Sequence, residues 1–314
     1  MLKARSWMFT PGNREKMLGK AGTMGADVTV IDVEDAVPPA EKADTAIKIP
    51  HHYQAIHERS ENSQVYVRIN AVEQTKMSQG EEYYECRGLE DLRHVVRPGL
   101  NGIFLPKVET ASMFYKAVAA IELMEREYKM DPGSVKIVAL IETVEGLVNL
   151  KQLSDVARVE ERITGFTFGG VDFALDYGMK IDEGFDVNSQ YSTPRYNIAL
   201  HARSAKLDHV IDSPWVGLKD IEGFEKTSQA AASLGYTGKM VVHPEQIKVA
   251  NKVFAPSEQE YQRAVKIIET FTEARKNGEG SVMVDGRLIE DPIKENAQRV
   301  VKLYEEINKE TFVR

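Results

Sequence analysis

The chain has 314 residues, 42% of them hydrophobic and 28% charged, so it can bury a sizeable core beneath a solvated surface. Its net charge of −8 argues against nucleic acid or a membrane surface as partner, because both require clustered Lys and Arg. With a single cysteine, Cys86, and no apolar run long enough for a signal peptide or a bilayer span, we expect a cytoplasmic protein without an internal disulfide.

Short apolar or β-branched runs recur along the chain, with helical patterns between them. Several runs are continuous, as in parallel strands that are covered on both faces. Eight strand–helix units favour an α/β fold of the closed (β/α)₈ TIM-barrel type over an open doubly wound sheet, and no GxGxxG motif follows the first run. The runs are residues 6–9, 28–31, 65–67, 103–105, 137–141, 163–168, 209–211 and 240–242.

The pattern changes beyond Pro256, so we assign residues 1–255 to a barrel and 256–314 to a C-terminal extension. The extension reads as a helix over 258–276, a hairpin over 281–289 and a last helix capped by Asp291. Asp285-Gly286 suits the tight type I′ turn of the hairpin. A barrel closes without these elements, so we expect them to form a lid or to bind a neighbouring subunit.

Polar residues follow nearly every predicted strand. The chemistry of a (β/α)₈ barrel takes place at the carboxyl ends of its strands, so these side chains are predicted to converge there. In chain order they are Asp32, Glu34 and Asp35, then Arg68 and Asn70, Lys107 and Glu109, Glu142, Asp172, Asp212 and His243.

Glu142 and Asp172 are candidate metal ligands, because Mg²⁺ binds through one or two carboxylates and keeps its other positions for water and substrate. The alternative is that each pairs with an Arg or Lys of the rim. Arg68 offers a planar fork for a carboxylate or a developing enolate oxygen, or else makes a structural ion pair. Glu34 and Asp35 either hydrogen-bond metal-bound waters and orient Arg68, or cap the next helix.

The first rim loop leads into a helix that carries Lys16 and Lys20, which is a candidate phosphate seat or a solvated helix face. His243 is either a base or a capping residue. Thr193 before Pro194 is expected to cap the helix that follows.

With these residues in place, the chain resembles the citrate lyase β-subunit-like family of the HpcH/HpaI aldolase superfamily, which includes malyl-CoA and citramalyl-CoA lyases. The resemblance covers nearly the whole chain. Seven segments carry it, in order: RSWMFTPGNREKMLGKA, GADVTVIDVEDAVPPAEK, VYVRIN, GIFLPKVET, IETVEGLVN, FTFGGVDF and GYTGKMVVHPEQI.

The resemblance implies a carbon–carbon lyase that uses Mg²⁺, with Mn²⁺ as a substitute, and whose substrate carries coenzyme A. It also implies a homo-oligomer, a trimer or hexamer. Glu142 and Asp172 would bind the metal, Arg68 would hold the cleaved acid, and Glu34 and Asp35 would support them. Phe9, Lys16, Lys20 and Lys42 would line the path of coenzyme A.

Two segments depart from the family pattern. The family supplies an acid–base Asp to a neighbouring subunit from a motif like MIDxP, and the matching position here is Glu290. After the seventh strand, the stretch that contains Val216 and Gly217 lacks the usual acidic pattern, which would reshape the thioester channel.

The reaction implied is the retro-Claisen cleavage of a small β-hydroxyacyl-CoA, such as malyl-CoA or citramalyl-CoA, into an acyl-CoA and a 2-oxo acid, or the reverse condensation. Two alternatives stay open. One is a class II aldolase that acts on pyruvate-like 2-oxo acids without coenzyme A. The other is a non-catalytic barrel subunit.

Overall fold

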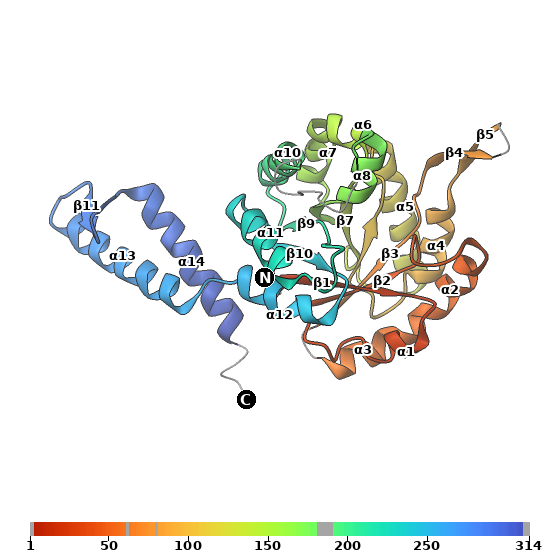
Figure 1. Ribbon diagram of the computed structural model, residues 1–314, viewed down its shortest axis with the longest axis horizontal. Coiled ribbons are helices and arrows are strands. Elements are labelled where there is room, and N and C mark those ends of the chain that lie inside the picture. Colours follow the sequence, from red (N-terminus) through yellow and green to blue (C-terminus); the bar gives the residue numbers. More distant parts are fainter. Residues whose placement is uncertain (1–2, 61–62, 79–80, 181–190, 310–314) are drawn as a thin grey trace. The chain divides into compact units, whose positions relative to one another are not determined.

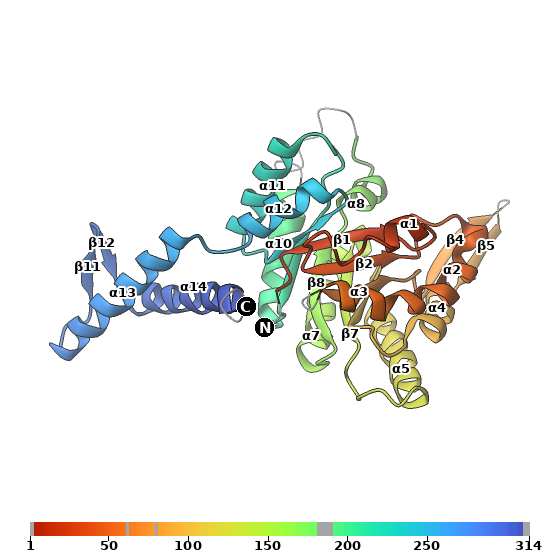
Figure 2. The ribbon, with the colours of Figure 1, turned by 90° about the horizontal axis from the view of Figure 1, so that it is seen from below.

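The computed structural model describes residues 3–60, 63–78, 81–180 and 191–309. Eight parallel strands close into a barrel in the order β1-β10-β9-β8-β7-β6-β3-β2, and helices surround it (Figures 1 and 2). The predicted (β/α)₈ fold is confirmed. The barrel strands are β1 (Ser6–Pro11), β2 (Val28–Asp32), β3 (Gln64–Arg68), β6 (Gly102–Leu105), β7 (Lys136–Ile141), β8 (Ile163–Phe168), β9 (His209–Asp212) and β10 (Gly238–Val241).

The barrel interior is filled by large side chains from alternate positions of the strands, since side chains on a strand alternate between its two faces. Trp7 is fully buried at its centre and makes edge contacts with Tyr66, Phe104 and His209 at centroid distances of 5.1, 5.2 and 5.4 Å. Its indole N–H donates to the carbonyl oxygen of Ala4 at 2.8 Å. The interior of the barrel is therefore a packed core rather than a channel. A ligand at the rim would rest against this core.

The helices cover the outside of the barrel. Met113, Ala117, Ile121 and Met124, which we placed on one helical face, are all buried on α5. The barrel helices are α1 (Glu15–Leu18), α2 (Lys42–Lys48), α3 (Tyr53–Arg59), α4 (Arg87–Val95), α5 (Ala111–Glu127), α6 (Val144–Val148), α7 (Leu150–Val159), α8 (Gly170–Tyr177), α10 (Ser192–Ser204), α11 (Ile221–Ser233) and α12 (Pro244–Val253), with short 3₁₀ turns at Pro39–Glu41 and Ile49–His52. None of the helices in the described part of the chain could cross a membrane.

One predicted helix cap was wrong, and one hairpin was missed. Helix α10 begins at Ser192 with Tyr191 as its N-cap, so Thr193 does not cap it and Pro194 lies in the first turn, where a missing N–H costs little. An antiparallel hairpin of β4 (Gln74–Ser78) and β5 (Glu81–Glu85) follows β3 and was not expected. Its sequence is mostly polar and gives no apolar run that would mark a strand.

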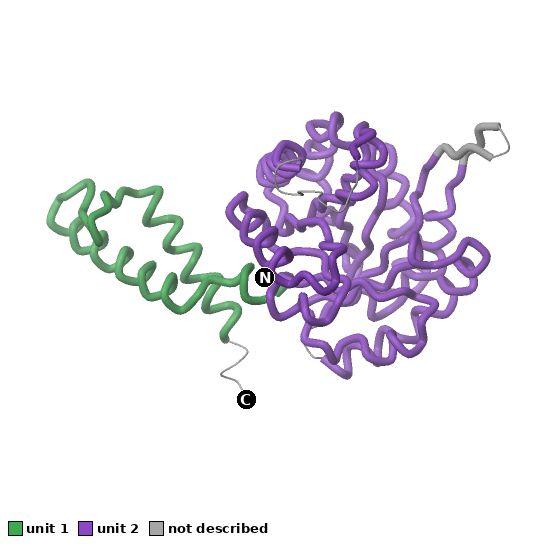
Figure 3. The backbone as a smooth tube through the Cα atoms, viewed as in Figure 1, with its two compact units in different colours: residues 1–3, 251–314 green, residues 4–250 purple. Residues whose placement is uncertain are grey.

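The chain divides into two compact units, residues 4–250 and residues 251–314 together with 1–3 (Figure 3). The second unit contains α13 (Glu258–Lys276), the hairpin of β11 (Val282–Val284) and β12 (Arg287–Ile289), and α14 (Asp291–Lys309). Asp285 and Gly286 have φ of 49° and 73°, as the predicted type I′ turn requires. The carbonyl oxygen of Glu290 accepts the N–H groups of Ile293 and Lys294, so Glu290 occupies the N-cap position that we gave to Asp291.

Asp212 does not join the rim, contrary to the sequence-based prediction. Its carboxylate is fully buried against Arg195 of α10, at 2.8 Å, and against the ammonium of Lys239 on β10. Residues at the end of a strand alternate in direction, and Asp212 points to the face opposite that of Ile211, which belongs to the barrel interior. It therefore ties the barrel wall to a covering helix.

His209 lies in the interior next to Trp7, and burial lowers its pKa from 6.5 to about 4, although Asp208 acts in the opposite direction. The unfolded chain therefore takes up this proton first as the pH falls below 6.5. Stability that is present above pH 6.5 is lost progressively toward pH 4, because the unfolded state binds more protons there.

We expect the free energy of unfolding of the native chain to fall from pH 7 to pH 5 by roughly 2 kcal/mol more than that of His209→Phe, which keeps a ring but cannot titrate. Urea denaturation at the two pH values measures this difference. Equal losses in both proteins would show that His209 is not the group responsible.

Candidate active site

The carboxyl ends of the strands surround a cavity of about 300 Å³. Its charged lining residues are Asp32, Arg68, Glu142 and Asp172. The N-terminus of α8 contributes Gly169, Gly170 and Val171, and most of the remaining wall is apolar. The structure thus brings together four of the side chains that follow strands β2, β3, β7 and β8. The apolar part of the wall includes Phe9, Met17, Leu140, Pro214, Met240 and Val242.

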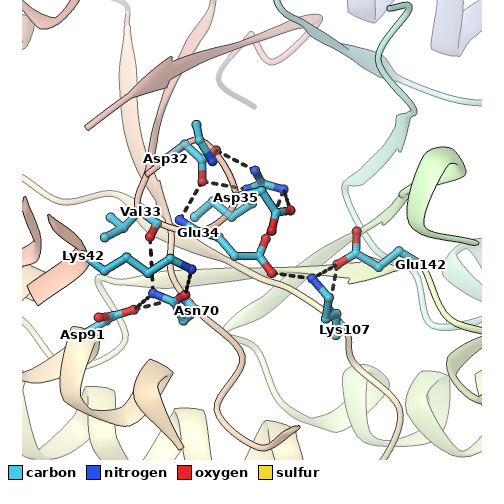
Figure 4. A network of polar contacts seen from close by, with 11 residues as sticks. Asp32, Val33, Glu34, Asp35, Lys42, Asn70, Asp91, Lys107 and Glu142 are labelled. Atoms are coloured by element: carbon cyan, nitrogen blue, oxygen red, sulfur yellow. Dashed lines mark hydrogen bonds and ion pairs between the residues drawn. The ribbon is translucent and has the colours of Figure 1, made fainter. Parts of the chain in front are cut away.

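Arg68 is held mainly by Asp32, its direct neighbour in the register of β2 and β3. Its Nε and Nη2 atoms donate to the two carboxylate oxygens of Asp32 at 2.8 and 2.5 Å, and its Nη1 lies 3.1 Å from Glu34 Oε2 and 3.5 Å from Asp35 Oδ2 (Figure 4). Asp32 occupies the guanidinium fork, which is the structural ion pair that the sequence left open beside a ligand contact. The Nη2 amino group carries a second N–H besides the one that Asp32 accepts.

Glu34 connects Arg68 to Lys107. The ammonium of Lys107 donates to Glu34 Oε1 at 2.5 Å, so the buried Glu34 carboxylate lies between two cations. Burial raises the pKa of Glu34 and the two cations oppose that rise. Lys107 itself follows β6 with a positive φ of 51°, a conformation that costs a non-glycine residue energy and brings both its backbone N–H and its side chain to the site.

Glu142 is the most deeply buried acid of the cavity, with 1% of its surface exposed. Its Oε1 accepts the backbone N–H of Lys107 at 3.0 Å and lies 3.9 Å from the ammonium of the same residue (Figure 4). Burial raises its pKa well above the usual range, and the nearby Glu34 and Asp172 add to the rise while Lys107 opposes it. A dipositive ion would supply the positive charge that this carboxylate lacks.

Gly169 makes room for that carboxylate. A Cβ atom at Gly169 would lie 2.4 Å from Glu142 Oε2 and 2.5 Å from its Cβ, so only glycine fits without displacing Glu142. Asp172 is the third residue of α8, one turn further on, and lines the same cavity. Within the described ranges no cluster of three or more His, Cys, Asp or Glu side chains is arranged to hold a metal. Two carboxylates that leave positions for water and substrate fit Mg²⁺ rather than a structural metal site.

The same two carboxylates also line a second cavity, of about 380 Å³. Glu142 and Asp172 line both cavities, and Lys107, Glu109 and Asp176 line only the second one. The first cavity is largely apolar and the second strongly acidic, so the two approaches to the carboxylate pair differ in character.

Other predicted residues do not line either cavity. Lys16 and Lys20 are exposed, on α1 and just after it, although Met17 between them lines the first cavity. Val216 is 70% exposed and, like Gly217, follows β9 beyond the lining residue Pro214. Glu290 lies exposed in the C-terminal unit.

Two further residues have structural partners. The ammonium of Lys42 donates to Asn70 Oδ1 at 2.6 Å, and Asn70 in turn donates to Asp91 at 2.7 Å (Figure 4). His243 accepts the backbone N–H of Glu245 through its Nδ1, which is the capping alternative rather than that of a base.

Asp32 and Lys107 were recognised only as polar residues at strand ends and received no place in the predicted site. The structure makes them the partners of Arg68, Glu34 and Glu142. The signal that could have found them is charge: buried acids and cations at neighbouring strand ends must pair with one another.

Comparison with known proteins identifies the family of the chain. The model of the family described as HpcH/HpaI aldolase/citrate lyase matches residues 5–244. The chain belongs to this family. The citrate lyase subunit beta of Leuconostoc mesenteroides subsp. cremoris is 33% identical over 95% of this chain and 92% of its own length. The L-malyl-CoA/beta-methylmalyl-CoA lyase of Cereibacter sphaeroides (strain ATCC 17025 / ATH 2.4.3) is 27% identical over 97% of this chain and 95% of its own length.

Solved structures agree on the fold. A citrate lyase from Burkholderia xenovorans LB400 superposes with a TM-score of 0.78 at 19% identity, over 99% of this chain and 92% of that one. A Mycobacterium tuberculosis protein solved with magnesium, acetoacetate and coenzyme A gives 0.65 at 21% identity, over 95% and 97%. The sequence-based identification of a lyase of this family is confirmed.

The position of Gly169 predicts a specific defect if Glu142 is a metal ligand. Gly169→Ala should then displace the Glu142 carboxylate and weaken Mg²⁺ binding at least about tenfold in isothermal titration calorimetry, because a ligand that is displaced by even a fraction of an ångström loses coordination geometry. Gly280→Ala is the matched control, since nothing lies within 4 Å of its added Cβ. Unchanged Mg²⁺ affinity in Gly169→Ala would show that Glu142 can shift without consequence.

Proposed function

We propose that this protein is a Mg²⁺-dependent lyase that cleaves a small β-hydroxyacyl-CoA, such as malyl-CoA or citramalyl-CoA, into an acyl-CoA and a 2-oxo acid, or forms it by the reverse condensation. One observation carries the proposal: a buried carboxylate, Glu142, and Asp172 line one cavity with the guanidinium of Arg68. The names of the relatives support it, since they include malyl-CoA and citrate lyases, and a structural neighbour was solved with magnesium and coenzyme A.

Glu142 and Asp172 would hold the metal, which when bound acts as a Lewis acid on the oxygens of the cleaved acid. Arg68 would donate its remaining Nη2–H to a substrate oxygen, while Asp32 keeps the guanidinium in one orientation. Glu34, which pairs with both Arg68 and Lys107, would keep these two cations at a fixed separation. The side chain of Asp35 is 56% exposed and would orient either a water molecule or the guanidinium of Arg68. These contacts exist before substrate arrives, so the site is preorganised.

The acyl-CoA arm would enter along the apolar wall of the first cavity, past Phe9 and Met17. We place the phosphate groups near the exposed Lys16 and Lys20, which flank Met17. Lys42 and the loop with Val216 and Gly217 are further candidates for contacts with coenzyme A. Their support is the family pattern rather than the lining of the cavity.

The decisive experiment combines turnover with metal binding. Purified protein with Mg²⁺ is offered malyl-CoA and citramalyl-CoA, and the products are detected by mass spectrometry, with Mn²⁺ tested as a substitute. Glu142→Gln should lose turnover by a factor on the order of 10³ and bind Mg²⁺ weakly, because an amide cannot replace the charge of the carboxylate. Glu145→Gln, an exposed acid three residues further on, is the control and should keep both.

Each of the other results points to a different function. Cleavage of 4-hydroxy-2-oxo acids without coenzyme A would identify a class II aldolase. Mg²⁺ and coenzyme A binding without turnover on any hydroxyacyl-CoA would indicate a non-catalytic subunit. Full Mg²⁺-dependent turnover by Glu142→Gln would show that the metal lies elsewhere.

We further propose that the C-terminal unit acts on a neighbouring subunit of a homo-oligomer, a trimer or hexamer, and delivers Glu290 as the acid–base group. Its hairpin presents exposed apolar side chains, Met283 at 59% and Leu288 at 51%. Glu290 follows β12 directly and its side chain is exposed, so it is available to a partner.

Mixing two inactive variants tests the shared site. Glu142→Ala and Glu290→Gln should each be inactive, but oligomers assembled from both should regain up to about a quarter of native activity, since some interfaces combine an intact metal site with an intact Glu290. Native mass spectrometry verifies that subunits have exchanged. Exchange without recovered activity contradicts a site shared between subunits.

A further inference from the structure

A group of buried polar side chains lies outside the rim site, between the barrel wall and the covering helices, and lines neither of the two cavities. Asp212 of β9 and Lys239 of β10 form an ion pair there, and Arg195 of α10 joins them. The Nε and Nη2 atoms of Arg195 donate to the two carboxylate oxygens of Asp212 at 2.8 and 2.9 Å. This two-point hydrogen bond fixes the first turn of α10 on the wall, because it sets both the position and the orientation of the guanidinium.

Tyr191, the N-cap residue of α10, belongs to the turn that Arg195 holds. The backbone N–H of Arg195 donates to the carbonyl oxygen of Tyr191 at 3.0 Å. The side chain of Tyr191 is buried, and its ring makes edge contacts with Phe168 of β8 and Phe173 of α8 at centroid distances of 5.0 and 6.5 Å. The barrel wall and the neighbouring rings therefore fix the position of the Tyr191 phenol.

The phenol of Tyr191 reaches the helix that carries Asp172. Its O–H donates to the carbonyl oxygen of Gly170, the first residue of α8, at 2.5 Å. The two helices are also in close contact here, since a Cβ added at Gly170 would lie 2.9 Å from Tyr191 Cε2. Burial raises the pKa of Tyr191 to about 12 while Arg195 opposes the rise, so the phenol stays a neutral donor at pH 7.

The first turn of α8 has little support from its own sequence. The helix has eight residues, and its N-cap, Gly169, has no side chain that could accept the first N–H groups. Asp176 accepts the backbone N–H of Val144 at 2.7 Å, which ties the last turn of α8 to α6. Tyr191 gives the first turn the support that Asp176 gives the last.

We propose that Tyr191 is a positioning residue for Asp172, which it holds in place by fixing the first turn of α8 through the carbonyl group of Gly170. The inference rests on the proposed function, in which Asp172 and Glu142 bind Mg²⁺. A group that orients a metal ligand from behind is worth roughly 10- to 100-fold in metal affinity, although it touches neither metal nor substrate. Tyr191 lines neither cavity, so it acts through the helix alone.

Tyr191→Phe tests the inference, because it removes the hydroxyl group and keeps the ring. Tyr236→Phe is the matched control, since its buried hydroxyl group donates to the carbonyl oxygen of Arg195 at 3.0 Å, within α10 rather than α8. The ion pair of Arg195 with Asp212 remains in the control and still holds the turn. In isothermal titration calorimetry with Mg²⁺, Kd should rise about tenfold in Tyr191→Phe and stay within about twofold of the native value in Tyr236→Phe.

Two further measurements separate positioning from a loss of stability. The urea midpoints of Tyr191→Phe and Tyr236→Phe should fall by similar amounts, because each variant loses one buried hydrogen bond. The electron paramagnetic resonance spectrum of bound Mn²⁺ reports the geometry of the ligands around the ion. This spectrum should change in Tyr191→Phe and match the native spectrum in Tyr236→Phe.

The route through Asp172 has its own test in a double-mutant cycle. In an Asp172→Ala background, Tyr191→Phe should change the affinity for Mn²⁺ by less than about twofold, since the side chain that it positions is gone. An additional loss as large as that in the native background shows that Tyr191 acts by another route and overturns the assignment.

The outcomes separate this inference from the proposed function. Unchanged Mg²⁺ affinity in Tyr191→Phe, when the native protein binds Mg²⁺, overturns the inference and leaves the proposed function standing. Equal losses of affinity in Tyr191→Phe and Tyr236→Phe also overturn it, because they would reflect a general loosening of α10. A native protein that binds no Mg²⁺ contradicts the proposed function, and the inference with it.

Discussion

The ion pair between Asp32 and Arg68 determines the arrangement of the whole site. The two residues are neighbours in the register of β2 and β3, so barrel closure brings them together without further adjustment. From Arg68 the charges alternate through Glu34 and Lys107 to Glu142, which links the ends of β2, β3, β6 and β7. A buried charge without a partner is costly, so each residue of this ion-pair network fixes the position of the next one.

The network is nevertheless not neutral. Burial raises the pKa of Glu142 well above its usual range, and the nearby carboxylates of Glu34 and Asp172 add to the rise, while Lys107 and Arg68 oppose it. A protein selected only for stability would not retain such an imbalance, since a half-compensated buried charge weakens the fold. Under the proposed function, a divalent ion would offset this imbalance. Gly169, whose missing side chain leaves room for the Glu142 carboxylate, helps to fix the position of this acid at the rim.

The two cavities that share Glu142 and Asp172 differ in the polarity of their linings. The first has a floor continuous with the hydrophobic core, and large side chains hold that floor in place. The second is acidic and includes Lys107, Glu109 and Asp176. An apolar lining in one cavity and a charged lining in the other would favour an asymmetric ligand, because the two ends of such a ligand differ in polarity.

The sequence by itself determined the barrel, since eight apolar runs separated by helical patterns have few other ways to bury both faces of a parallel sheet. It also located Glu142, Asp172 and Arg68, because residues that follow parallel strands meet at one rim. The sequence could not determine to which face of the barrel wall a strand-end side chain points, or which charged side chains form ion pairs. Asp212 also ends a strand, but it faces the covering helices, since one step along a strand reverses the side chain. Asp32 pairs with Arg68, 36 residues away in the sequence, and Lys107 pairs with Glu34, 73 residues away. Only the tertiary structure brings such residues into contact. The burial of each side chain and the net charge around it, which decide how these acids and cations pair, therefore cannot be read from the sequence.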